Sequence, residues 1–249
     1  MVLLKSPAEL EKMRRAGAVV AQVLVEIAEL VKPGATTADL DLFAQTRTKE
    51  LGAKPAFKGY HGFPATLCVS VNEEVVHGIP SKKRILKEGD IVGIDFGVIL
   101  DGWFGDSART FAVGKIAPEA QKLLEITEKS LHLGIEQARA GQHLFDIGHA
   151  VQNFVESHGY SVVREFVGHG IGKSLHEDPQ VPNFGIRGKG MLLKPGMVLA
   201  IEPMINAGKP EVRVLSDGWT AVTVDKALSA HFEHTVAITE QGPEILTRV

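Results

Sequence analysis

The sequence contains a single cysteine, Cys68, among its 249 residues. One thiol excludes an internal disulfide, and such low cysteine content is typical of a reducing compartment. No segment reaches the ~18 consecutive apolar residues that a membrane-spanning helix needs. The few residues before Lys5 are too short for a signal peptide. We therefore expect a cytoplasmic protein without a membrane anchor.

The chain also lacks a strong charge of either sign. Its formal net charge is −3, which produces no long-range field for nucleic acid or anionic lipid. The hydrophobic fraction of 44% and the charged fraction of 23% are ordinary for a globular domain. No segment rich in proline, serine or glycine separates two parts of the chain. We therefore expect residues 1–249 to share one core in a single domain.

What the sequence does contain is an internal repeat. The segment 86–95 reappears as 193–202, and each copy ends an apolar run with a carboxylate, Asp95 in the first and Glu202 in the second. The same offset of 107 positions relates earlier residues in pairs: Gly34 with Gly141, and Asp39 with Asp146. We infer a duplicated half in which each copy directs an acid to the same place.

Each half, roughly 7–113 and 118–240, is predicted to run in the order helix, helix, strands. The expected helices are 7–31, 37–51, 119–138 and 145–158, and the expected strands lie within 66–80 and at 90–98, 106–113, 161–167, 197–205, 212–216, 220–224 and 232–238. Because helices cluster before strands instead of alternating with them, the pattern favours an α+β fold.

Four acids are predicted to meet inside the sheet. Asp95 and Asp106 lie on the arms of one hairpin with a turn near Asp101, and period-two alternation puts both on one face in either register. Glu202 matches Asp95 by the repeat, and Glu233 ends an apolar run in the place that Asp106 holds. Unpaired buried carboxylates are costly, so this cluster requires bound cations.

A histidine flanked by glycines, His169 in the segment 167–172, adds a nitrogen ligand. Four carboxylates and one imidazole exceed the three protein ligands of a usual catalytic zinc and suit two divalent ions with bridging carboxylates. The oxygen-rich set favours Mn, Fe or Co, with Zn also compatible. A metal-activated water then predicts hydrolysis of an amide or a phosphoester.

Two further histidines, His77 and His176, occur beside glycine-rich segments and are candidates for substrate hydrogen bonding or transition-state stabilisation. The segment 172–174 is no phosphate loop, because the first glycine of that motif would fall at Val167. His176-Glu177 lacks the second histidine of a zincin helix. The remaining histidines are interpreted as structural: His61, His132, His143, His149, His158, His231 and His234.

Several short motifs, each a modest signal, occur in an order that is specific to one family. They are 72–80, Gly93–Gly97, Gly105–Phe111, Gly168–Gly172, His176-Glu177, Ile201–Pro203 and Glu233–Thr235. With all five ligand types present, the chain resembles the type I methionine aminopeptidases of the bacterial kind, members of metallopeptidase family M24. The resemblance covers nearly the whole length, from Met13 to the final strand.

The resemblance implies the pita-bread fold, in which two pseudo-twofold-related halves surround a curved antiparallel sheet with helices on its outer face. It implies a single catalytic domain that removes the initiator methionine from nascent polypeptides when the second residue is small. Two rivals share the fold: a prolidase or aminopeptidase P, which normally carries an extra N-terminal domain, and an inactive binding protein, which would have lost ligands. We further expect a monomer that meets the ribosome transiently, and the small net charge predicts no nucleic-acid site.

Carried over by position, the resemblance implies two divalent metal ions. Asp95 would hold one ion, Asp106 and Glu233 would bridge, and His169 and Glu202 would hold the other.

Glu202 would also carry a proton to the leaving amine, while His77 and His176 would contact the scissile peptide. The methionine side chain would enter an apolar pocket that involves Tyr60, Phe63, Cys68, His77 and Trp219, with Phe57 and Leu175 nearby. Leu175 stands where an aromatic residue is expected, and Phe63 where tyrosine is common, which bears on fine specificity alone.

Overall fold

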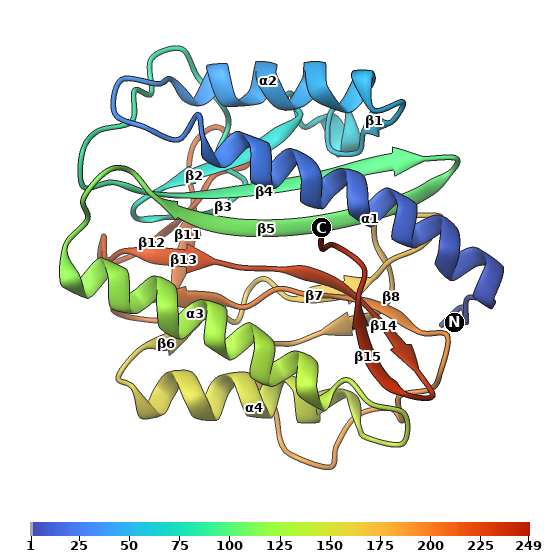
Figure 1. Ribbon diagram of the computed structural model, residues 1–249. Helices are drawn as coiled ribbons and strands as arrows, with labels where there is room; N and C mark the ends of the chain where they lie inside the picture. The colour runs from blue at the N-terminus through green and yellow to red at the C-terminus, as the bar shows by residue number, and fades with distance from the viewer. Residues whose placement is uncertain (1) are drawn as a thin grey trace.

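Helices precede strands in each half of the chain. In the computed structural model, which describes residues 2–249, α1 (Pro7–Ala28) and α2 (Thr37–Glu50) come before the strands of the first half, and α3 (Pro118–Gln137) and α4 (Leu144–Ser157) before those of the second (Figure 1). This segregation confirms the predicted α+β class. Among residues 2–249, no helix is both long and apolar enough to cross a membrane.

The strands are short apart from one long hairpin. The first half holds β1 (Lys54–Pro55), β2 (Leu67–Val71), β3 (Glu74–Val76), β4 (Ile91–Leu100) and β5 (Trp103–Ala112), with a 3-10 turn, η1 (Tyr60–Gly62). The second half holds β6 (Ser161–Val162), β7 (Gly168–Gly170), β8 (Glu177–Val181), β9 (Val198–Ile201), β10 (Met204–Asn206), β11 (Val212–Val214), β12 (Ala221–Thr223), β13 (Ser229–His231), β14 (His234–Thr239) and β15 (Gly242–Ile245).

The first helix begins and ends where its local chemistry requires. At its start, the Ser6 N–H donates to the Glu9 carboxylate at 2.9 Å, and the Ser6 hydroxyl accepts from the Glu9 N–H at 3.4 Å, which completes a capping box. The helix ends at Ala28, before the predicted Val31. Pro33 disfavours helical geometry in the residue before it, and the chain turns at once.

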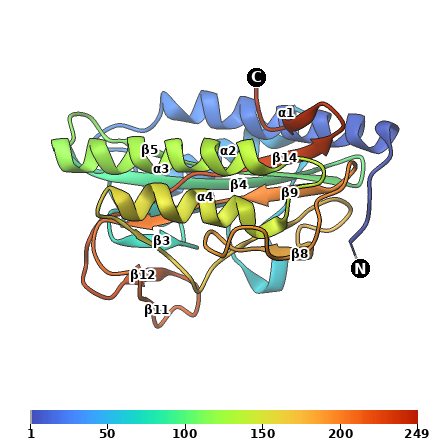
Figure 2. The same cartoon turned by 90° about the horizontal axis from the view of Figure 1, so that it is seen from below.

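The helices α1 and α3 lie on the opposite side of the long strands from the small sheet of β3, β11 and β12 (Figure 2). Figure 2 shows α1 and α3 on one side of β4 and β5, and β3, β11 and β12 on the other. The helix α1 packs on β4 and β5, and α3 packs on α4. The fully buried side chains of α1 include Met13, Val20 and Ile27, so its apolar face closes the core against the hairpin.

Two antiparallel sheets meet at the centre of the molecule. In the first, β4 pairs with β5 on one edge and with β1 and β2 on the other; the second has the order β15-β14-β9-β7-β8. Two threonine hydroxyls attach the second half to β5: Thr110 bonds to His231 of the small sheet β13-β10-β6, and Thr235 of β14 joins the two sheets directly. Thr110 accepts from the His231 N–H at 2.9 Å and donates to its carbonyl at 2.8 Å, while Thr235 makes the equivalent pair with Asp106 at 3.1 and 2.7 Å.

The repeated sequence makes repeated contacts. The Gly34 N–H donates to the Leu86 carbonyl at 2.9 Å, and 107 positions later the Gly141 N–H donates to the Leu193 carbonyl at 3.0 Å. Isolated bridges recur at the same spacing, between Thr36 and Ile85 and between His143 and Leu192. Each copy therefore fixes the start of the strand that leads to Asp95 or to Glu202.

The structure differs from the predicted strands at several places. The strand expected at 197–205 is divided into β9 and β10, because Pro203 lacks the N–H that a continuous ladder needs. The strand expected at 161–167 ends at Val162, and pairing resumes in β7. Neither β8 nor β15 was predicted, since both contain a proline and neither alternates between apolar and polar residues.

Candidate metal centre and active site

The β4–β5 hairpin positions the first two acids. Asp101 and Gly102 have φ values of +51° and +79°, the left-handed geometry of a two-residue hairpin turn. The resulting register pairs Asp106 with Gly97 and Asp95 with Ala108, so the two aspartates are diagonal neighbours on one face. A Cβ at Gly97 would lie 2.7 Å from the Phe57 ring and 3.3 Å from Asp106 Oδ1, so this glycine leaves room for both side chains.

The second half delivers Glu202 and Glu233 to the same place. Glu202 follows β9 at the break before Pro203, and Glu233 lies between β13 and β14. The Glu233 N–H donates to the Ala108 carbonyl at 2.8 Å, and the Ser107 hydroxyl donates to the Glu233 carbonyl at 2.5 Å. These bonds hold Glu233 beside β5 and next to Asp106.

His169 comes from the middle of β7. Its Nδ1 lies 2.9 Å from the Gly170 carbonyl, so Nδ1–H donates there and the Nε2 lone pair faces the acids. Nε2 is 3.5 Å from Glu202 Oε1 and 3.9 Å from Asp106 Oδ2. One ligand atom each from Asp106, His169 and Glu233 lie within 4.8 Å of one another. This spacing fits a shared cation.

Burial opposes charge on every one of these groups. It raises the pKa of Asp95 to about 7, and together with the neighbouring charges it raises the pKa values of Asp106, Glu202 and Glu233 well above their ordinary range. Burial also lowers the pKa of His169 to about 3, which keeps the imidazole neutral, as a metal ligand must be.

Three carboxylate oxygens show what the cluster lacks. Asp95 Oδ1, Asp106 Oδ1 and Glu233 Oε1 are buried without a hydrogen-bond partner among the described residues. Buried polar atoms in native proteins normally have partners, and carboxylate oxygens are ligands for divalent cations. The donor set therefore fits divalent metal binding.

One cavity of about 270 Å³ opens onto this cluster. Its lining contains all five predicted ligands and every other site residue predicted from the sequence: Phe57, Tyr60, Phe63, Cys68, His77, Leu175, His176 and Trp219. It also contains residues that the sequence analysis did not select: His61, Val76, Phe166, Val167 and Met204. Of these, Met204 had a signal, because it follows Glu202 at the spacing of two that strand neighbours on one face share.

The cavity has an apolar end and a polar end. At the apolar end the rings of Phe63 and Trp219 meet edge to face with centroids 5.1 Å apart. Burial raises the pKa of the Cys68 thiol well above its usual range, so it is neutral and behaves as an apolar wall. At the polar end, Tyr60 Oη lies 2.7 Å from His176 Nδ1. The site can therefore hold a side chain on one side of the acids and a polar backbone beside them.

His77 is held in an uncommon backbone conformation, with φ of +62°. The next residue, Gly78, accepts from the Val69 N–H through its carbonyl at 2.8 Å and donates its own N–H to Ser70 Oγ at 3.2 Å. A Cβ at Gly78 would collide with the Val69 carbonyl. Only glycine therefore lets this segment approach β2 closely enough to place the His77 ring in the cavity.

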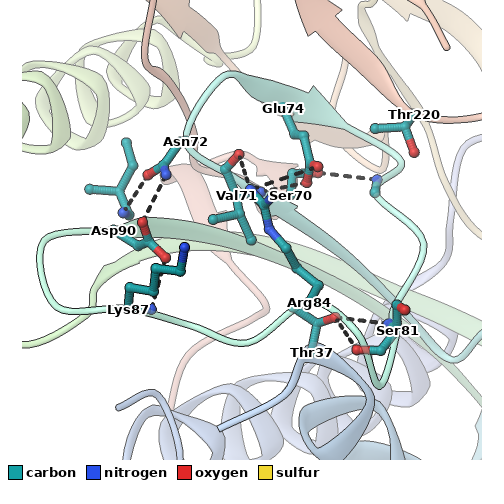
Figure 3. A network of polar contacts seen from close by, with 12 residues as sticks. Thr37, Ser70, Val71, Asn72, Glu74, Ser81, Arg84, Lys87, Asp90 and Thr220 are labelled. Atoms are coloured by element: carbon teal, nitrogen blue, oxygen red, sulfur yellow. Dashed lines mark hydrogen bonds and ion pairs between the residues drawn. The ribbon is translucent and has the colours of Figure 1, made fainter. Parts of the chain in front are cut away.

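A polar network fixes the turn that precedes His77 (Figure 3). The Asn72 amide donates to Asp90 at 2.9 Å and accepts from the Ile91 N–H at 3.0 Å. The Glu74 carboxylate accepts from the Val71 N–H at 2.7 Å. These bonds tie the β2–β3 turn to the start of β4, so the strand that carries Asp95 also supports the segment that carries His77.

Two histidines interpreted as structural from the sequence lie at the site. His61 lines the cavity, and His231 Nε2 is 3.7 Å from Glu202 Oε2. A histidine in a strand with apolar neighbours resembles an ordinary core residue, so the sequence offered no signal for His231. The other histidines of that group do not line the cavity: His132, His143, His149, His158 and His234.

Comparison with known proteins agrees with the metal binding that the geometry indicates. Residues 11–240 match metallopeptidase family M24, and the chain belongs to this family. It is 55% identical to methionine aminopeptidase 1 of Bacillus subtilis over 249 residues, 100% of both chains, and 55% identical to a Clostridium acetobutylicum methionine aminopeptidase over 247 residues, 99% of both. The resemblance to the bacterial type I methionine aminopeptidases is thus confirmed.

Solved structures confirm the pita-bread fold. The crystal structure of methionine aminopeptidase from Thermotoga maritima superposes with a TM-score of 0.99 at 48% identity, and 100% of each chain is covered. The prolidase from Pyrococcus furiosus has a TM-score of 0.80 at 24% identity, and the chain covers 65% of it. That second likeness shows a common fold alone.

Proposed function

We propose that this chain is a metal-dependent aminopeptidase that removes the N-terminal initiator methionine from nascent polypeptides whose second residue is small. The observation that carries the proposal is the buried cluster of acids and His169 at the wall of one largely apolar cavity. Identity of about one half to methionine aminopeptidases over the full chain supports the same substrate.

The five ligand candidates divide between two cation positions in this proposal. Asp95 would hold one divalent ion, His169 and Glu202 would hold the other, and Asp106 and Glu233 would serve both. Mn, Fe, Co and Zn all suit this set of oxygen and nitrogen donors. When bound, such ions polarise the scissile carbonyl and lower the pKa of a coordinated water toward neutrality.

Glu202 is the general base and general acid of the proposed reaction. Burial and the charges of Asp95 and Asp106 raise the pKa of its carboxyl group, which brings it closer to that of a general base and acid working near neutral pH. In the proposed reaction, Glu202 takes a proton from the attacking water and delivers it to the departing amine. The same carboxyl group serves both steps because it faces the cavity beside the other ligands.

His176 stabilises the negative charge that develops on the carbonyl oxygen. Burial raises the pKa of the Tyr60 phenol, so its hydroxyl stays protonated, and in this proposal it donates to His176 Nδ1, 2.7 Å away. The imidazole proton is then on Nε2, and Nε2–H is free to donate to the oxyanion. Burial lowers the pKa of His176 and lowers that of His77 to about 4, so both rings act as neutral hydrogen-bonding groups.

The apolar end of the cavity receives the methionine side chain. Phe57, Phe63, Cys68, Leu175 and Trp219 supply a wall of rings, one thiol and one branched side chain. Aromatic rings and a thioether make favourable contacts, which suits methionine over a charged side chain. Leu175, at 2% exposure, leaves more room than an aromatic residue would.

Two peptide substrates and one variant test the function. With Mn²⁺ or Co²⁺ present, the chain should release methionine from Met-Ala-Ser and leave Ala-Pro intact; the reverse preference would establish the prolidase alternative. Asp106→Ala should abolish methionine release. Asp101→Asn is the matched control, because Asp101 lies at the exposed turn of the same hairpin and asparagine accepts its positive φ. Full activity of Asp106→Ala would contradict the proposal, and the inactive-homologue alternative predicts no release from either peptide.

The setting of this reaction is also part of the proposal. We place it in the cytoplasm, in a monomer whose residues 1–249 act as one catalytic domain. The substrates are the N-terminal Met-peptides of nascent chains, met during transient contact with the ribosome and without a nucleic-acid site of its own. The net charge of −3 supports the last point.

A further inference from the structure

His231 has a buried ring nitrogen that the proposed reaction does not use. The residue ends β13 and is 4% exposed, and its Nε2 has no hydrogen-bond partner among the described residues. Its neighbour is the Glu202 carboxylate, with Oε2 at 3.7 Å. A buried nitrogen without a partner is costly, so its direction toward this carboxylate needs a reason.

Two histidines face the two oxygens of Glu202 separately. His169 Nε2 lies 3.5 Å from Oε1, and His231 Nε2 lies 3.7 Å from Oε2. His169 presents a lone pair, because its proton is donated from Nδ1 to the Gly170 carbonyl. When Glu202 is ionised, as a metal ligand must be, only a protonated nitrogen attracts its oxygen, so the arrangement assigns the imidazole proton of His231 to Nε2 in that state.

The backbone of His231 is fixed, whereas Glu202 sits at a break. The Thr110 hydroxyl bonds both the N–H and the carbonyl of His231, and β10 pairs Met204 with it. Glu202 lies between β9 and β10, before Pro203, outside any ladder. A movement of ~0.7 Å by the Glu202 carboxylate brings the pair within the usual hydrogen-bond distance of ~3.0 Å.

We propose that His231 is a positioning residue for Glu202: its Nε2–H donates to Oε2 and holds the carboxylate so that Oε1 faces His169. The inference rests on the proposed function, in which Glu202 is both a metal ligand and the proton carrier. Loss of the hydrogen-bond partner of a metal ligand typically lowers metal affinity 10- to 100-fold. His231 therefore tunes the cation position that His169 and Glu202 share.

Binding of Mn²⁺ to the metal-free full chain, measured by calorimetry, tests the inference. His231→Leu removes the donor and should weaken Mn²⁺ binding about 10-fold or more. His231→Gln carries an amide N–H at a similar reach and should keep the affinity within about threefold of the wild type. In a Glu202→Ala background, His231→Leu should cause no further loss, because the bond then has no acceptor.

Each contrary outcome overturns the inference in its own way. Wild-type affinity in His231→Leu would show that the ring does nothing for Glu202. Equal losses in His231→Leu and Glu202→Ala/His231→Leu relative to their parents would show an effect independent of Glu202. A changed visible spectrum of the Co²⁺ form in His231→Gln would make His231 a ligand itself.

Thermal unfolding and activity complete the test. The melting temperature of the metal-free His231→Gln variant is measured alongside its Mn²⁺ affinity. If both fall, His231 acts only through packing. Methionine release by the wild type is measured in parallel. If the wild type binds Mn²⁺ as expected but releases no methionine, the proposed function fails while the His231 result still stands.

Discussion

The Tyr60 hydroxyl lies 2.7 Å from Nδ1 of His176, although the two residues are 116 positions apart in the chain. Tyr60 belongs to η1, and His176 precedes β8 in the other half of the molecule. A residue expected only to line the methionine pocket thus contacts a proposed catalytic histidine, and in the proposed mechanism its hydroxyl donates to Nδ1 of that histidine.

The variant Tyr60→Phe should show whether the Tyr60 hydroxyl orients His176 or whether Tyr60 only shapes the pocket. The ring remains, but the donor to Nδ1 is lost, so Nε2 no longer carries the proton in every molecule. We expect kcat for methionine release to fall about tenfold, equivalent to about 1.4 kcal/mol of transition-state stabilisation, with KM changed less than about threefold. Steady-state kinetics on Met-Ala-Ser measures both. A raised KM at unchanged kcat would mean that Tyr60 is only a pocket wall.

The metal-free protein should lose stability as pH rises above 7. The pKa values of Asp106, Glu202 and Glu233 are raised well above normal by burial, so the folded state holds protons that the unfolded chain has already released. The stability these protons supply is lost as pH rises through the folded-state pKa values. The buried histidines, with lowered pKa values, oppose this trend only below about pH 6.5.

Urea denaturation in EDTA at about pH 7.0, 7.4 and 7.8 measures this trend, below the pKa of about 8.5 at which the Cys68 thiol would ionise in the unfolded chain. Added Mn²⁺ should remove or reverse it, because a cation replaces the protons between the carboxylates. A metal-free stability that rises over this interval would show that the acids are not jointly buried. Asp106→Asn should flatten the metal-free dependence, since one of the titrating groups is gone.

The ion pair between Lys5 and Glu177 should connect the segment before α1 to the active site. Lys5 Nζ lies 2.6 Å from Glu177 Oε2, with side-chain exposures of 5% and 11%, and Glu177 Oε1 accepts from the Lys173 N–H at 2.8 Å. Lys5→Met leaves the carboxylate buried without its cation and should cost about 3 kcal/mol of unfolding free energy. It should also lower kcat, because Glu177 holds the loop that ends in His176.

The double variant Lys5→Met/Glu177→Gln controls for the unpaired charge. It should recover a large part of the unfolding free energy in urea denaturation, since no ion is then left uncompensated. Equal stability of Lys5→Met and the wild type would show that the pair contributes nothing. The surface pair Arg109–Glu128, at 3.9 Å, is a matched exposed control whose removal should change stability by less than about 1 kcal/mol.

Gly78→Ala should displace His77 without touching any metal ligand. The new Cβ would collide with the Val69 carbonyl, so the segment must move away from β2. We expect a loss of roughly 2 kcal/mol in unfolding free energy and at least a tenfold fall in kcat/KM. Mn²⁺ affinity should stay within about threefold of the wild type, because the ligands lie on other segments.

Gly93→Ala is the matched control on β4. A Cβ there would have Thr110 Oγ1 at 3.5 Å as its nearest neighbour, which is an ordinary contact. This variant should retain kcat/KM and stability. If both alanine variants behaved alike, close approach at Gly78 would not explain the position of His77.

The sequence predicted that the acids and His169 meet, and they line one cavity, because the signals for them are local. Asp95 and Glu202 end repeated segments, and Asp106 sits at a spacing from Asp95 that puts both on one face of a hairpin in either register. Capping residues and glycines marked the helix starts and ends to within a few residues. The strands β8 and β15 went unpredicted, because their pairing depends on neighbours far along the chain and their composition opposes strand formation.

The sequence by itself determined the class of fold, the acids and His169, and the family, since each follows from residue type, spacing and order along the chain. Only the tertiary structure decided that His231 faces Glu202 and that Tyr60 reaches His176. It also decided that Lys5, through Glu177, supports the loop that ends in His176. The physical reason is distance along the chain: local patterns record which face a side chain takes, whereas a partner in the other half is set by how two sheets pack. The apolar neighbours of His231 in the sequence do not indicate that its side chain faces the carboxylate of Glu202.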